Sequence, residues 1–128
     1  IGPVRKETQV EISITDSFKL GLTPPIRQSG DLEGTPGIKI VGPKGEIEIP
    51  KGVIVAGRHI HMQKYIADIR GYKDGEIVKV ETYGERKIIM CNVVLRVSDK
   101  MAKEMHIDVD EANAAGLKND DYVKIIRE

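Results

Sequence analysis

Apolar and polar residues alternate along several short stretches of this chain, which is the pattern of half-buried β-strands. The clearest case is residues 9–15, where Val10, Ile12 and Ile14 would point to one face and the residues between them to the other. Further strands are predicted at residues 38–41, 46–49, 53–56, 76–82, 87–97 and 122–126. The pattern therefore predicts a mainly β fold.

Three short helices are predicted between these strands, each followed by a glycine. A helical turn is expected at residues 16–21, a short helix at 63–69 and the clearest helix at 108–115. The order helix, glycine, turn and strand occurs at residues 63–80 and again at 108–126, with a fainter copy at 16–27. These copies form a weak internal repeat.

Short strands interrupted by single short helices indicate small β-barrels capped by helices. We assign residues 1–50 to the remainder of a first barrel domain or to its crossover segment. Residues 51–128 are assigned to a second barrel domain, and a single unit is the alternative. A turn at residues 42–45 predicts a hairpin, and residues 29–37, rich in glycine, are expected to form a loop.

Composition narrows the class of partner. The chain has 128 residues, and its 20 lysines and arginines equal its 20 aspartates and glutamates, so net charge gives no reason to expect nucleic acid or a membrane as a partner. The lone cysteine, Cys91, excludes an intramolecular disulfide and fits a reducing compartment such as the cytoplasm. Because Cys91 lies within an apolar stretch, we expect it to be a buried small hydrophobe rather than a ligand or nucleophile.

Candidate chemistry begins at His59 and His61, which follow the apolar strand 53–56. Alternate residues of an extended chain share a face, so both imidazoles are available to one metal ion. The third and last histidine, His106, is expected to join them. The alternative is that the pair is hydrogen-bonded to backbone without a ligand and that His106 is a polar residue before a helix capped by Asp108 or Asp110.

Four charged residues are further candidates. Glu11 would add a carboxylate to a mixed ligand set suited to zinc, unless it is simply exposed on a strand. Arg5, Arg27 and Arg58 are candidates for binding an anion, because a guanidinium holds phosphate through two parallel hydrogen bonds, and for Arg27 a solvated surface charge is favoured. The loop at residues 29–37 could offer backbone N–H groups to phosphate, although it matches no phosphate-binding motif.

Four blocks, at residues 2–13, 29–37, 56–62 and 105–113, resemble in this order the phosphate propanoyltransferase family, the PduL-type phosphotransacylases. The resemblance implies two β-barrel domains with a two-metal site between them. It also implies an enzyme that moves a propanoyl or acetyl group between coenzyme A and inorganic phosphate with zinc as cofactor. The alternatives are a non-catalytic metal-binding β-barrel module and a metal-dependent acyl-CoA thioester hydrolase.

Carried over by position, the resemblance makes His59, His61 and His106 ligands of one zinc ion. It makes Glu11 a catalytic residue and a carboxylate ligand that is shared with, or belongs to, the neighbouring metal. Arg5 becomes the phosphate-binding and catalytic arginine, and Arg58 stands in the family's Arg-His-x-His block. The family also has an upstream His-x-His block that is absent from these 128 residues, so we expect this chain to be a portion of the enzyme.

The resemblance implies acyl-CoA and phosphate as the partners, and leaves open further copies of the chain, an N-terminal segment and a microcompartment shell. It places the protein in the cytoplasm or in the lumen of a bacterial microcompartment, in propanediol degradation.

Overall fold

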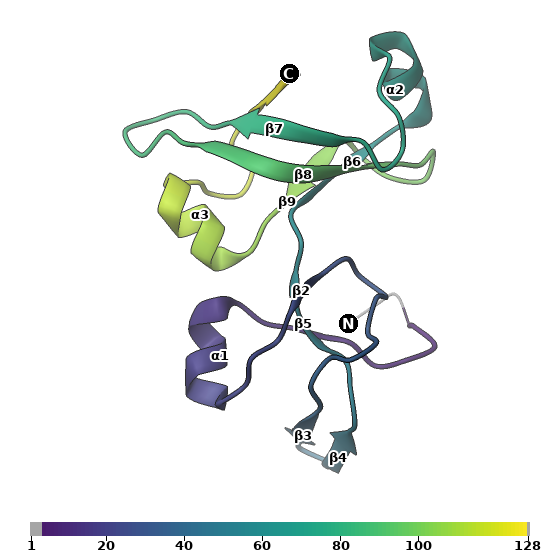
Figure 1. The fold of residues 1–128 in the computed structure, drawn as a ribbon, viewed down its shortest axis with the longest axis vertical. Helices are drawn as coiled ribbons and strands as arrows, with labels where there is room; N and C mark the ends of the chain where they lie inside the picture. Colours follow the sequence, from purple (N-terminus) through teal and green to yellow (C-terminus); the bar gives the residue numbers. More distant parts are fainter. Residues whose placement is uncertain (1–3, 128) are drawn as a thin grey trace. The chain divides into compact units, whose positions relative to one another are not determined.

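The computed structural model describes residues 4–127, which form a mainly β structure with three short helices (Figure 1). The chain divides into two compact units, Ile1–Gly57 and Arg58–Glu128. The predicted division lay between residues 50 and 51. In the structure the strand β5 (Val53–Ala56) belongs to the first unit, because it pairs in parallel with two earlier strands.

The first unit contains a three-stranded sheet and a hairpin. In the sheet, β5 lies between β1 (Val10–Glu11) and β2 (Ile26–Arg27). The hairpin joins β3 (Ile38–Gly42) to β4 (Gly45–Ile49), which confirms the hairpin predicted from the sequence. Its four isoleucines share one face, because Ile38 is paired with Ile49 and Ile40 with Ile47.

The strand predicted at residues 9–15 is wrong beyond its first part. The strand ends at Glu11, and the helix α1 (Ile14–Leu20) begins three residues later. Ser13 stops the extended pattern because its hydroxyl accepts a hydrogen bond from the backbone N–H of Asp16 at 3.0 Å, as an N-cap does. Local capping therefore overrides the apolar alternation.

The second unit is built on one five-stranded sheet that curls into a half-barrel. Its strands are β6 (His59–Met62), β7 (Ile77–Glu81), β8 (Ile89–Val97), β9 (Glu104–His106) and β10 (Lys124–Ile126), in the order β10-β7-β8-β6-β9. All neighbours are antiparallel except β6 and β8. Its core is made by Ile60, Met62, Ala67, Val78, Val80, Met90, Val93, Leu95 and Ala115.

The predicted repeat is present in this unit with a spacing of 45 residues. The helices α2 (Lys64–Arg70) and α3 (Val109–Ala115) both end at a left-handed glycine, Gly71 and Gly116, with φ angles of 68° and 67°. The strands that follow, β7 and β10, pair with each other. The strands that precede the helices, β6 and β9, also pair with each other. The repeating unit is therefore strand, helix, turn and strand.

One strand of this sheet was missed from the sequence, and one prediction on it is wrong. The strand β9 was not expected, and Cys91 is exposed rather than buried. Cys91 is exposed because β8 contains a bulge. Val78 of β7 pairs with Val93 of β8, and Val80 pairs with Met90, so β8 has one more residue than β7 between these two pairs. Asn92, at a φ of 56°, takes up this extra residue, and both Cys91 and Asn92 then face outward.

Candidate metal centre

Two paired strands bring the three histidines together. The histidine pair was predicted to lie at the end of the strand β5. In the structure it forms a separate strand, β6, which belongs to the five-stranded sheet of the second unit. In the antiparallel pairing of β6 with β9, His59 is opposite His106 and His61 is opposite Glu104. Opposite residues share a face, so all three imidazoles lie on one face, while Ile60 between them is buried in the core.

The imidazoles are close enough to hold one ion. One possible ligand atom from each of the three lies within 4.8 Å of the others. The Nε2 atoms of His59 and His61 are 3.1 Å apart, and the three ring centroids are separated by 4.8–5.1 Å. Two nitrogens bound to one tetrahedral zinc ion at about 2.0–2.1 Å would be about 3.3 Å apart. The separation of the His59 and His61 Nε2 atoms therefore suits one zinc ion.

The environment of His61 favours the neutral form that binds metals. His59 is buried, His61 is half-buried and His106 is exposed. Burial lowers the pKa of His61, and positive charge on His106 and Arg96 lowers it further. Its Nδ1 atom is buried and has no hydrogen-bond partner within residues 4–127. A neutral imidazole keeps a lone pair for a cation.

Two charged neighbours of this cluster were missed from the sequence. Arg96 on β8 is paired in register with His61, and the Oε2 atom of Glu104 is 3.4 Å from Nε2 of His106. The 45-residue repeat could have identified Glu104 as a neighbour of the cluster. Glu104 lies 45 residues after His59, just as His106 lies 45 residues after His61. Extending the repeat upstream from the helices would have identified both correspondences.

Arg58, which directly precedes His59, forms an ion pair in the same unit. Its Nε atom lies 2.6 Å from Oε1 of Glu111 on α3. Burial raises the pKa of Glu111, and this is opposed by the backbone N–H of Asp108 and by the Arg58 guanidinium. The predicted phosphate-binding arginine is therefore already held by a half-buried carboxylate.

Glu11 and Arg5 belong to the first unit, and their roles stay predictions. Glu11 is exposed on β1, where its Oε1 atom accepts a hydrogen bond from the side-chain amide of Gln9 at 2.6 Å. Arg5 is exposed and precedes the first strand. Arg27, for which a surface role was favoured, forms a 3.0 Å ion pair with Asp31.

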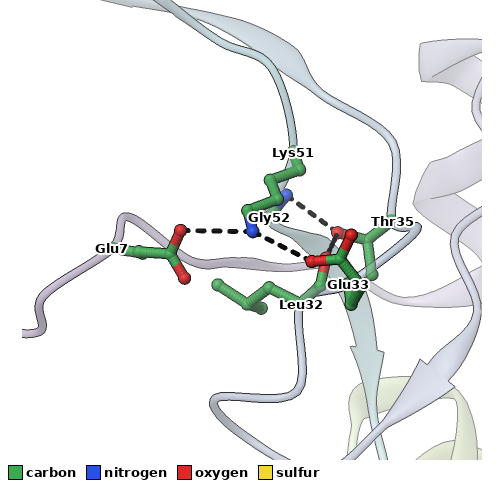
Figure 2. Close-up of polar contacts among 6 residues, drawn as sticks. All are labelled: Glu7, Leu32, Glu33, Thr35, Lys51 and Gly52. Carbon is green, nitrogen blue, oxygen red and sulfur yellow. Dashed lines mark hydrogen bonds and ion pairs between the residues drawn. The ribbon is translucent and has the colours of Figure 1, made fainter.

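The loop at residues 29–37 is held by its own polar groups. Figure 2 shows Lys51 between Glu7 and Glu33, at 3.3 and 3.2 Å, and the Thr35 hydroxyl between two backbone groups. That hydroxyl donates to the carbonyl of Leu32 at 2.6 Å and accepts from the N–H of Gly52 at 2.9 Å.

Several backbone N–H groups of the same loop are already bonded. Gly30 donates to Oε1 of Gln9, and Asp31 and Thr35 donate to carbonyls three residues earlier. These three N–H groups are therefore used within the chain, and the loop does not offer them to phosphate.

A mainly β protein with three convergent imidazoles on one sheet belongs to the class of candidate metalloproteins. None of the helices within residues 4–127 has the length and apolar character that crossing a bilayer requires. A family model for phosphate propanoyltransferase matches residues 1–118, and the chain belongs to this family.

Relatives support this membership along nearly the whole chain. The chain is 54% identical to the phosphate propanoyltransferase of Rhodopseudomonas palustris, a match that covers 99% of this chain and 56% of the relative. It is 57% identical to that of Thermotoga maritima, covering 98% of this chain and 60% of the relative. It is 52% identical to the phosphate propanoyltransferase of Clostridioides difficile, covering 99% of this chain and 61% of the relative. The chain thus spans less than two thirds of the length of these relatives.

Proposed function

We propose that this chain contributes a zinc site to a phosphate acyltransferase that moves a short acyl group, propanoyl or acetyl, between coenzyme A and inorganic phosphate. The observation that carries the proposal is the cluster of His59, His61 and His106 in a chain of this family. The relatives are named phosphate propanoyltransferase, which motivates the choice of acyl group and acceptor.

The donor set suits zinc or another borderline divalent ion. Three neutral imidazoles are typical of catalytic zinc sites, which keep a further position open for water or substrate. The 3.1 Å separation of the two Nε2 atoms fits either a hydrogen bond between the rings or two lone pairs that face one ion. The unpartnered Nδ1 of His61 is a second sign that this network is incomplete without a ligand.

In the reaction, a phosphate oxygen attacks the thioester carbonyl. A carbon–oxygen bond forms, the carbon–sulfur bond breaks, and the proton released by phosphate accompanies the thiolate to give free coenzyme A. A bound divalent ion would polarise the carbonyl and stabilise the developing oxyanion. Phosphate is itself the nucleophile, so the chain needs no serine or cysteine nucleophile.

The charged residues have roles in this scheme that suit their chemistry. Arg5 would bind phosphate through two parallel hydrogen bonds, and Glu11 would supply a carboxylate ligand to a second metal. Arg58 is the second candidate for phosphate, and its ion pair with Glu111 holds its guanidinium in one place. This scheme assigns no role to Cys91, which is exposed at the bulge of β8.

Two other functions remain as outcomes of the test. A non-catalytic module would use the histidines as a structural metal site, and a thioester hydrolase would use water in place of phosphate. The experiment is to measure release of coenzyme A from propanoyl-CoA, with and without phosphate, together with the zinc content of the same sample.

Each outcome separates these functions. Release that requires phosphate, with bound zinc, supports the acyltransferase. Release without phosphate indicates the hydrolase. A zinc content near one ion per chain without release of coenzyme A indicates that the histidines bind metal but that this chain is insufficient for catalysis. The experiment would then be repeated after adding the upstream part of a relative. A chain without zinc would contradict the ligand assignment.

A further inference from the structure

The carboxylate of Glu111 contacts two segments that flank histidines of the cluster. Its Oε1 atom pairs with Nε of Arg58 at 2.6 Å, and Arg58 directly precedes His59. Its Oε2 atom accepts the backbone N–H of Asp108 at 3.1 Å, two residues after His106. One side chain therefore connects the start of β6 to the end of β9.

These two contacts lie at the same end of the strand pair. Because β6 and β9 are antiparallel and His59 is opposite His106, the residue before His59 and the residues after His106 lie next to each other. A link between them at this end fixes the distance between the strands at the His59–His106 pair. Imidazoles that ligate metals need such fixed orientation, which outer residues usually supply.

We propose that Glu111 is a positioning residue of the candidate metal centre, which holds His59 and His106 at the separation required to bind one ion. This inference rests on the proposed function, because it concerns the same three histidines. Glu111 acts through Arg58 and Asp108.

The role goes beyond that of a helix cap. Glu111 and Asp108 form a capping box, in which the Asp108 side chain accepts the N–H of Glu111 at 2.8 Å. Glutamine serves equally well as glutamate in this motif, so the cap alone does not require a negative charge. The negative charge of Glu111 forms the ion pair with Arg58. A half-buried ion pair contributes little net stability, because both charged groups lose their contacts with water. The contribution of the Arg58–Glu111 ion pair is therefore to fix the position of Arg58 relative to α3.

The matching copy of the repeat lacks this link. The residue that corresponds to Glu111 is Ile66, and the N-cap Gln63 makes no side-chain capping bond. His59 and His61 in that copy lie two residues apart on one strand, which itself places them on the same face. His106 comes from a separate strand, so it is the ligand for which an additional link is needed.

The test is Glu111→Gln in the full 128-residue chain, which keeps the capping acceptor and removes the charge. Glu81→Gln is the matched control, because Glu81 also forms an ion pair, with Lys87, and its side chain has the same 20% exposure. Cobalt(II) is the probe, since its visible absorption reports both affinity and ligand geometry. We expect Glu111→Gln to raise the cobalt dissociation constant roughly tenfold and to change the spectrum, and Glu81→Gln to leave both unchanged.

A double-mutant cycle tests the route through Arg58. If Glu111 acts through the ion pair, Arg58→Met and Glu111→Gln weaken cobalt binding by similar factors, and the double variant is no worse than either. Wild-type affinity in Glu111→Gln, the same loss in Glu81→Gln, or fully additive losses in the double variant would each overturn the inference.

A measurement without metal separates this inference from the proposed function. The ring signals of His59 and His106, followed by NMR in the metal-free chain, should shift in Glu111→Gln and stay in place in Glu81→Gln. Unchanged signals overturn the positioning role even when the wild-type chain binds cobalt. A wild-type chain that binds neither cobalt nor zinc overturns the metal centre itself, and with it the purpose assigned to Glu111, whatever the ring signals do.

Discussion

The two copies of the repeat in the second unit have similar backbones but different chemistry. In the first copy, β6 carries two histidines, and α2 follows an N-cap, Gln63, that makes no side-chain capping bond. In the second copy, β9 carries one histidine and one glutamate, and α3 begins with a complete capping box. The shared backbone pairs the strands, while the differing side chains give two of the three clustered imidazoles to the first copy and the third imidazole, together with Glu111, to the second.

This difference teaches that a cluster of imidazoles able to hold a metal ion can form where two repeats pair, without symmetric side chains in the two repeats. His61 and His106 are equivalent by position, whereas His59 corresponds to Glu104. A strictly symmetric pair would offer four imidazoles. The glutamate in the fourth position leaves three imidazoles beside one carboxylate, and three protein ligands are the number typical of zinc sites that keep a position open.

The largest expected effect comes from the two equivalent histidines. We expect His61→Ala and His106→Ala each to raise the zinc dissociation constant by roughly 100-fold or more, because each removes one of three neutral ligands. Competition titration against a zinc-binding dye measures this constant. Lys64→Met, on the exposed surface of α2, is the control and should keep the wild-type value. If only one of the two histidine variants loses zinc, the three-histidine centre is wrong.

The sequence predicted the parts of this site that are local. Alternation along a strand was enough to place His59 and His61 on one face, and the turn and glycine signals were enough to find both copies of the repeat. Asp108 was one of two caps expected for the last helix, and its side chain does form the cap. Each of these features depends on residues within a few positions of one another.

The remaining parts depend on pairing between distant strands, which no local pattern specifies. The strand β9 has three residues, too few to show an alternation, and is extended because it pairs with β6. The exposed position of Cys91 depends on a bulge against β7. The pairing of Glu111 with Arg58 joins residues 53 positions apart, and it exists only after the sheet has brought the end of β9 to the start of β6.

A smaller effect is expected from the helix caps. Asp108→Ala removes the acceptor for the N–H of Glu111 and should lower the free energy of unfolding by about 1–2 kcal/mol. Gln63→Ala at the equivalent position should change it by less than about 0.5 kcal/mol, because no capping bond is lost. Urea denaturation of the metal-free chain measures both values. Equal losses at the two positions would show that the capping box is not what distinguishes the copies.

The smallest effect concerns the turn after each helix. Gly75 and Asp120 are equivalent, and both have left-handed backbone, with φ angles of 76° and 70°. Glycine adopts this region without strain, whereas a residue with a Cβ is disfavoured there by about 1 kcal/mol. Gly75→Ala should therefore lower the free energy of unfolding by about 1 kcal/mol. Asp120→Gly should raise it by about 0.5 kcal/mol or less, since added freedom of the unfolded chain offsets part of the gain.

Urea denaturation also measures this pair, and the paired design separates backbone strain from side-chain contacts. An added Cβ at Gly75 meets no atom within 4 Å, so a loss there reflects the backbone alone. Gly45→Ala in the hairpin of the first unit is the control, because it has the same open surroundings at a φ of 147° and should also be destabilising. If Asp120→Gly is destabilising instead, the Asp120 side chain stabilises its turn, and the two copies differ in turn chemistry as well as in their caps.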